Sequence, residues 1–137
     1  MAAALRIVVA LTALSGLFPF ERAQAVDLTG AWASDADNCK QVFTRKGRAK
    51  QLGFTALSQQ HGGGFIVEAD RLRGKFATCR IKNQKEDGQT VNIIASCASD
   101  IMLSNVQFSL KVLEPNKMTR TFPGMQDMEI SYYRCEI

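Results

Sequence analysis

The sequence is poor in the residue types on which most enzyme and metal sites depend. Its 137 residues include a single histidine, His61, and four cysteines, none of them in C-x-x-C spacing. A lone imidazole argues against a Cys/His metal cage, and the cysteine spacing argues against a zinc ribbon or a thioredoxin-like motif. The run Gly62-Gly63-Gly64 after His61 has no following Lys-Ser/Thr, so we expect a turn with positive backbone angles rather than a phosphate loop. We therefore expect no catalytic residues, no metal and no cofactor.

Long hydrophobic runs are also scarce, and the one clear case lies in the first 25 residues. A cation at Arg6 precedes an apolar run from Ile7 to Phe18, and the small-residue triplet Ala23-Gln24-Ala25 follows. This pattern is typical of a secretory signal peptide, whereas a membrane anchor needs about 20 apolar residues. We expect cleavage after Ala25, a single domain over residues 26–137, and a periplasmic or secreted protein that is not transmembrane after cleavage. Disulfides persist in such compartments.

Charge is unevenly distributed along the chain. Residues 40–85 carry eleven Lys and Arg against two acidic residues, whereas residues 86–137 carry four against seven. Such asymmetry suggests an anionic partner, although a solvated sheet face that is balanced elsewhere in the fold is the simpler explanation. The adjacent pair Tyr132 and Tyr133 is too small an aromatic group to suggest base stacking, so we expect no nucleic acid.

Apolar and polar residues alternate in many short segments, which predicts an all-β fold. The clearest segment places Val106, Phe108, Leu110 and Val112 on one face. Turn residues separate the segments, and a meander of eight short strands can close into an antiparallel barrel. A short helical turn near 34–43, capped by Ser34 or Asp35, interrupts the pattern. The expected strands are 28–33, 50–57, 64–69, 72–82, 89–97, 106–112, 117–122 and 128–135.

Two disulfides are expected. If residues 76–97 form a hairpin with a three-residue loop and a bulge, Cys79 lies opposite Cys97 and Ile81 opposite Ala95, close enough for a bond. Cys39 and Cys135 then pair by default, which requires the 34–43 segment to fold back towards the last strand. The alternation also slips between Lys75 and Cys79, so we expect a bulge near Ala77 and Thr78.

Alternate loops of a meander barrel meet at the same end, and one end is expected to mix cations with large apolar side chains. That end gathers residues 34–49, 70–71, 99–104 and 123–127, and the opposite end is polar. An apolar patch with a basic rim is typical of a binding surface. The alternative is that Ile101 and Leu103 plug the barrel as core. The candidate binding residues are Arg45, Lys46, Arg48, Arg71, Ile101, Met102, Leu103, Phe122 and Met125.

The triplet Gly30-Ala31-Trp32 opens the first strand and resembles the G-x-W start of lipocalin-like and avidin-like barrels and of small periplasmic metalloprotease inhibitors. That resemblance implies a Trp at the barrel floor and a mouth at the opposite end. The wider pattern is similar to a small uncharacterised family of secreted four-cysteine proteins of alphaproteobacteria, which implies no activity. The matching stretches are residues 27–35, 64–68, 100–110 and 132–135.

These features favour a non-enzymatic binding or inhibitor-like module that uses the mouth loops against a protein or an anionic envelope component. A lipocalin-like small-molecule carrier and a structural envelope protein are the alternatives. An eight-stranded barrel is either filled by side chains or holds one small ligand. Four phenylalanines, Phe54, Phe65, Phe76 and Phe108, are available to fill it, so we expect the filled version.

Overall fold

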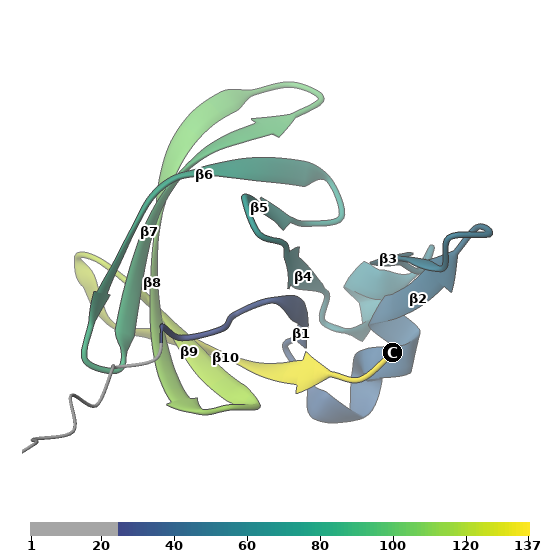
Figure 1. Ribbon diagram of the computed structural model, residues 1–137, viewed down its shortest axis with the longest axis horizontal. Coiled ribbons are helices and arrows are strands. Elements are labelled where there is room, and N and C mark those ends of the chain that lie inside the picture. Colours follow the sequence, from purple (N-terminus) through teal and green to yellow (C-terminus); the bar gives the residue numbers. More distant parts are fainter. Residues whose placement is uncertain (1–24) are drawn as a thin grey trace, which may run out of the picture.

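The computed structural model describes residues 25–137, and the predicted signal peptide therefore lies almost wholly outside the described residues. Eight strands form a closed antiparallel barrel, in which β1 completes the circle between β4 and β10 (Figure 1). From β4 to β10 each strand pairs with the next, so the prediction of an eight-stranded meander barrel is confirmed. The barrel strands are β1 (Gly30–Ala33), β4 (Gly64–Val67), β5 (Arg71–Arg73), β6 (Ala77–Asp87), β7 (Thr90–Ser99), β8 (Leu103–Glu114), β9 (Lys117–Phe122) and β10 (Met125–Cys135).

Two of the expected strands differ from those in the structure. The segment expected at 50–57 is not a barrel strand, because β2 (Phe43–Lys46) and β3 (Gln51–Phe54) form a separate two-stranded hairpin. The single strand expected over 72–82 is two strands, β5 and β6, with a turn at residues 74–76 between them. The total of eight is kept because one expected strand leaves the barrel and another divides.

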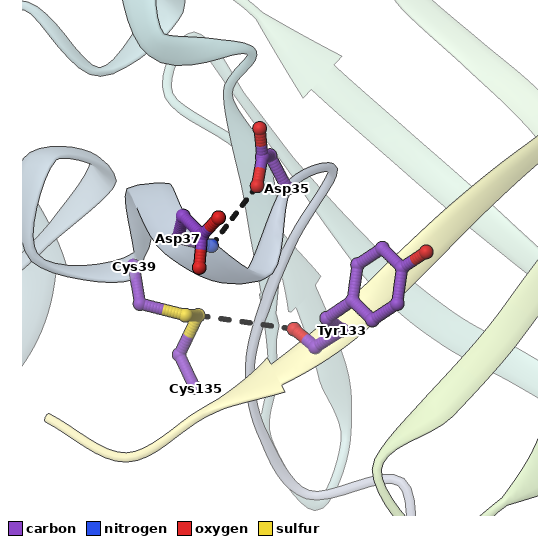
Figure 2. The surroundings of a disulfide bond; sticks show 5 residues. All are labelled: Asp35, Asp37, Cys39, Tyr133 and Cys135. Atoms are coloured by element: carbon purple, nitrogen blue, oxygen red, sulfur yellow. Dashed lines mark hydrogen bonds between the residues drawn. A yellow bond between two sulfur atoms is a disulfide. The ribbon is translucent and has the colours of Figure 1, made fainter.

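The excursion between β1 and β4 folds back along the outside of the barrel, as the second disulfide requires. It contains the 3-10 turns η1 (Ala36–Asn38) and η2 (Ser58–His61) and the one-turn helix α1 (Cys39–Val42). Asp35 caps η1 by accepting a hydrogen bond from the Asp37 backbone N–H at 2.9 Å (Figure 2). The helical turn expected at 34–43 and the Cys39–Cys135 disulfide are both confirmed.

Strand alternation divides the apolar side chains between two cores. Trp32 points into the barrel and is fully buried with Val91, Ile93, Leu110 and Met118. Its neighbours Ala31 and Ala33 point outwards and form a second core with the hairpin and α1, which lie beside the barrel on the right of Figure 1. No helix within residues 25–137 has the length and apolar character needed to cross a bilayer.

The hairpin of β6 and β7 has the predicted register at its cysteines. Cys79 lies opposite Cys97, Ile81 lies opposite Ala95, and the Cys79–Cys97 disulfide links the two strands. The expected bulge is present but lies between Ile81 and Asn83, not at Ala77 and Thr78, because the turn at 74–76 already resets the alternation. The extra residue moves the tip of the hairpin to Gly88-Gln89, where Gly88 has a φ of +58°.

The end of the barrel opposite the expected mouth is closed by Trp32 and Arg134. The Trp32 Nε1–H donates to the Leu28 carbonyl at 2.8 Å, and the Arg134 guanidinium carbon lies 4.4 Å from the indole ring. Arg134 also donates to the carbonyls of Asp27 at 2.7 Å and Pro115 at 3.0 Å. One side chain thus joins the segment before β1 to the β8–β9 turn across this closed end.

Candidate functional site

The turn between β7 and β8 carries the most exposed apolar side chains of the described chain. Ile101 is 92 % exposed, Leu103 83 % and Met102 61 %. A hydrogen bond of 3.0 Å from the Ser99 N–H to the Met102 carbonyl closes the turn, and the three apolar side chains face solvent. The alternative that Ile101 and Leu103 plug the barrel as core is therefore wrong.

Phe76 joins this surface, although the sequence pattern predicts a place for it inside the barrel. It lies in the β5–β6 turn, is 71 % exposed, and is followed by Ala77, which pairs with Ser99 at the base of the β7–β8 turn. The sequence feature that could have indicated this position is the Gly74-Lys75 pair directly before Phe76, because glycine is typical of turns rather than of strands. We call Phe76, Ile101, Met102 and Leu103 the apolar rim.

Phe122 and Met125 flank the β9–β10 turn at the same end of the barrel. Met125 is 54 % exposed and pairs with Phe122 across Pro123-Gly124. Phe122 is half-buried, and its ring lies 4.6 Å from the guanidinium carbon of Arg120. Of these two predicted residues, Met125 is therefore presented to solvent, whereas Phe122 packs against a side chain from the barrel interior.

The predicted cations Arg45, Lys46 and Arg48 lie on the β2–β3 hairpin, outside the barrel wall. Two hydrogen bonds hold this hairpin against the rim end: Arg73 donates to the Leu52 carbonyl at 2.8 Å, and Lys75, next to Phe76, donates to the Thr55 carbonyl. Arg45 has a structural role, because its Nε–H donates to the Ile137 carbonyl at 2.9 Å. The exposed cations of this element, which we call the basic hairpin, are Arg45, Lys46, Arg48 and Lys50.

Arg71 does not belong to this end of the molecule. The β4–β5 turn that precedes it lies with the β6–β7 and β8–β9 turns at the opposite end, because β4 and β5 are consecutive antiparallel strands. Its Nε lies 3.0 Å from Asp70 Oδ1 and 3.3 Å from Glu68 Oε2. The hydrogen bond from Arg71 lowers the pKa of the Asp70 carboxyl below its ordinary value. The expectation that Arg71 is a mouth residue is wrong.

The barrel interior contains a cavity of about 200 Å³, so the expectation of a filled barrel is also wrong. Of the four phenylalanines expected to fill it, Phe54 packs in the outer core against Phe43, and Phe76 is exposed. Only Phe65 and Phe108 remain inside, and both line the cavity. The lining also includes Leu72, Ala77, Leu110 and Tyr132.

Arg120 also lines this cavity and was not identified from the sequence. It shares the inward face of β9 with Met118, and its guanidinium carbon lies 4.5 Å from the Phe108 ring and 4.6 Å from the Phe122 ring. Its Nε is buried and has no hydrogen-bond partner. The ion pairs within residues 25–137 join only Glu68 and Asp70 to Arg71 and Arg73. The available signal was the alternation Met118, Arg120, Phe122, which places a charged residue between two inward positions.

Other chemistry is sparse at this end of the barrel. Among the residues that the structure describes, no three His, Cys, Asp or Glu side chains gather to hold a metal ion, and all four cysteines are disulfide-bonded. The described residues thus offer an apolar rim, a basic hairpin and a cavity lined by one arginine whose buried Nε–H has no partner. A comparison with protein-family models, curated proteins and solved structures finds no match to this chain.

Proposed function

We propose that the protein is a non-enzymatic envelope protein that docks, rim first, on an anionic lipid surface in an oxidising compartment. The observation that carries the proposal is the exposure of three consecutive apolar side chains, Ile101, Met102 and Leu103, at the end of a closed barrel. Exposure of large apolar side chains to water is unfavourable, and burial of one Ile or Leu side chain lowers the free energy by about 1.5–3 kcal/mol. Interfacial protein segments bury such side chains at the boundary between headgroups and acyl chains.

The position of the basic hairpin supports a lipid surface rather than an uncharged partner. Lys46, Arg48 and Lys50 are exposed on the hairpin that Lys75, next to Phe76, joins to the rim end of the barrel. No ion pair with a described residue neutralises them. Each cation near an anionic bilayer adds about 1 kcal/mol of attraction. Asp100, next to Ile101, opposes this attraction, so the charged contact falls to the hairpin and the apolar contact to the rim. The two disulfides suit a periplasmic or secreted location.

The test is co-sedimentation with phosphatidylcholine vesicles, with and without phosphatidylglycerol. The rim variant Ile101→Ser/Leu103→Ser is compared with the matched control Ile94→Ser/Leu113→Ser, which removes two exposed aliphatic side chains from the barrel wall. We expect the rim variant to bind at least about 100-fold more weakly, since two such side chains are removed, and the control to bind as the unmodified protein does.

A second pair of variants tests the charge. Lys46→Gln/Arg48→Gln removes two cations from the hairpin, and Lys82→Gln/Lys85→Gln removes two exposed cations from β6. The first pair should weaken binding to phosphatidylglycerol vesicles about 10-fold or more, and the second much less. Equal losses in rim and control variants, or binding that does not depend on the anionic lipid, would refute docking in this orientation.

A further inference from the structure

The barrel cavity and Arg120 form a second site that the docking surface does not use. The cavity of about 200 Å³ lies at the rim end of the barrel interior, between Gly64, Gly74 and Ala77 on one wall and Phe108 and Arg120 on the other. Ligand pockets for drug-sized molecules usually exceed ~300 Å³. With about 30 Å³ for each water-sized group, this cavity of about 200 Å³ has room for roughly seven non-hydrogen atoms.

The unpaired guanidinium defines the chemistry of the group that the cavity takes. Arg120 is half-buried, and its Nε–H is the part that is buried without a hydrogen-bond partner. Such a group is costly, and arginine keeps its charge in proteins, so Arg120 cannot reduce this cost by losing a proton. Two aromatic rings already lie against the guanidinium, those of Phe108 and Phe122. These contacts leave the N–H edge, including the buried Nε–H, as the part without a partner. A planar acceptor of matching width satisfies that edge with two parallel hydrogen bonds.

We propose that the cavity binds a small monoanionic carboxylate with a compact apolar tail, its carboxylate on Arg120 and its tail against Leu72, Ala77 and Leu110. One negative charge matches the single cation of the lining, whereas a phosphate monoester brings about −1.5 to −2. Tyr132 is the other cavity residue with a polar side chain, and its ring packs edge-on against Phe65 at 4.8 Å, which fixes its position in the wall. The site lies inside the barrel and does not require the protein to bind a membrane.

The test is calorimetric titration in lipid-free buffer with hexanoate and hexanamide, which have the same shape and differ in charge. We expect hexanoate to bind at least 10-fold more tightly than hexanamide. In Arg120→Met, hexanoate should bind about 10- to 100-fold more weakly, while hexanamide should lose far less, because its single neutral carbonyl oxygen accepts a weaker hydrogen bond from Arg120 than a carboxylate does. Hexanamide binding also shows that the variant is folded.

Two controls separate the site from general electrostatics. Lys117→Met removes a cation from the same strand but from the outward face, where the ammonium lies 5.6 Å from the Tyr133 ring, and should leave hexanoate affinity unchanged. Ala77→Leu fills part of the cavity and should weaken both ligands together. In the unmodified protein, hexanoate affinity should fall as the pH is lowered through the pKa of the free acid, while hexanamide affinity should not.

Three outcomes would overturn the proposal: equal affinity for hexanoate and hexanamide, undiminished hexanoate binding by Arg120→Met, or no hexanoate binding at millimolar concentration. Each of these results leaves the vesicle measurements unaffected, because the variants of the rim and of the hairpin do not line the cavity. Loss of vesicle binding in the rim variant likewise implies no change in its affinity for hexanoate. Failure of one proposal is therefore distinguishable from failure of the other.

Discussion

The two disulfides close loops of very different length, and this difference predicts how much each stabilises the fold. Cys39 and Cys135 are 96 residues apart in sequence, whereas Cys79 and Cys97 are 18 apart. Loss of loop-closure entropy in the unfolded chain amounts to about 4.7 kcal/mol for the first bond and about 3.2 kcal/mol for the second. We therefore expect Cys39→Ala/Cys135→Ala to lose about 1.5 kcal/mol more stability than Cys79→Ala/Cys97→Ala.

The difference is a sounder quantity than either loss alone, because both double variants remove the same atoms. Cys79, Cys97 and Cys135 are also similarly buried, at 7 %, 9 % and 9 % exposure. The assay is equilibrium unfolding in urea with the remaining disulfide intact, as checked by peptide mapping without reduction. A difference of about 1.5 kcal/mol corresponds to roughly 6 °C in Tm for a domain of this size.

The opposite order of stabilities would refute this reasoning. Suppose that the Cys79/Cys97 variant is the less stable of the two. The contribution of the cross-strand link within the β6–β7 hairpin to stability is then larger than the effect of loop length. The entropy of the unfolded chain would not decide which disulfide stabilises the fold more. Equal losses would lead to the same conclusion, since the sulfur atoms removed are the same in number.

Two further predictions concern backbone approach and acid stability. A Cβ at Gly64 would lie 2.2 Å from the Trp32 carbonyl oxygen, so Gly64→Ala should destabilise the barrel by more than about 2 kcal/mol in urea unfolding. In the control Gly53→Ala, the nearest atom would be 3.7 Å from the new Cβ, and stability should be nearly unchanged. Similar unfolding midpoints for the two variants would contradict the packing of Gly64 against β1. The hydrogen bond from Arg71 lowers the pKa of Asp70, so the resulting stabilisation is present above the ordinary carboxyl pKa and is lost as the pH falls through the lowered one. Asp70→Asn should therefore be slightly less stable than the unmodified protein by a constant amount above about pH 4, and this difference should shrink at lower pH. A difference that does not shrink in acid would contradict the assignment.

The barrel was predictable because its strands alternate cleanly and its turns carry glycine, proline, aspartate and asparagine. The register of Cys79 with Cys97 followed from the same alternation. The error over Arg71 has a specific physical origin. Counting 50–57 as a barrel strand reversed the direction of every later strand, and merging β5 with β6 reversed it again. The turn at residues 70–71 lies between these two errors, so it was assigned to the wrong end.

The cavity was not predictable from composition, because whether a phenylalanine fills a barrel depends on which element carries it. Phe54 lies on a hairpin that covers the outside of the barrel, and Phe76 lies on a turn. Neither location follows from hydrophobicity, since both residues sit in segments that alternate like strands. Arg120 was detectable in principle, because it occupies an inward position of β9, but only the structure shows that its Nε has no partner.

The shortness of β5 makes one part of the barrel wall weaker than the rest. Only two residue pairs join β4 to β5, Ile66 with Arg73 and Val67 with Leu72, whereas β6 and β7 pair over their whole length. Local unfolding costs least where few backbone hydrogen bonds and contacts must break. We expect amide hydrogen exchange to be fastest here among the barrel strands. Leu72 and Gly74 line the cavity at this point, so transient separation of β4 from β5 would open a lateral gate through which water and small solutes exchange without passing the rim.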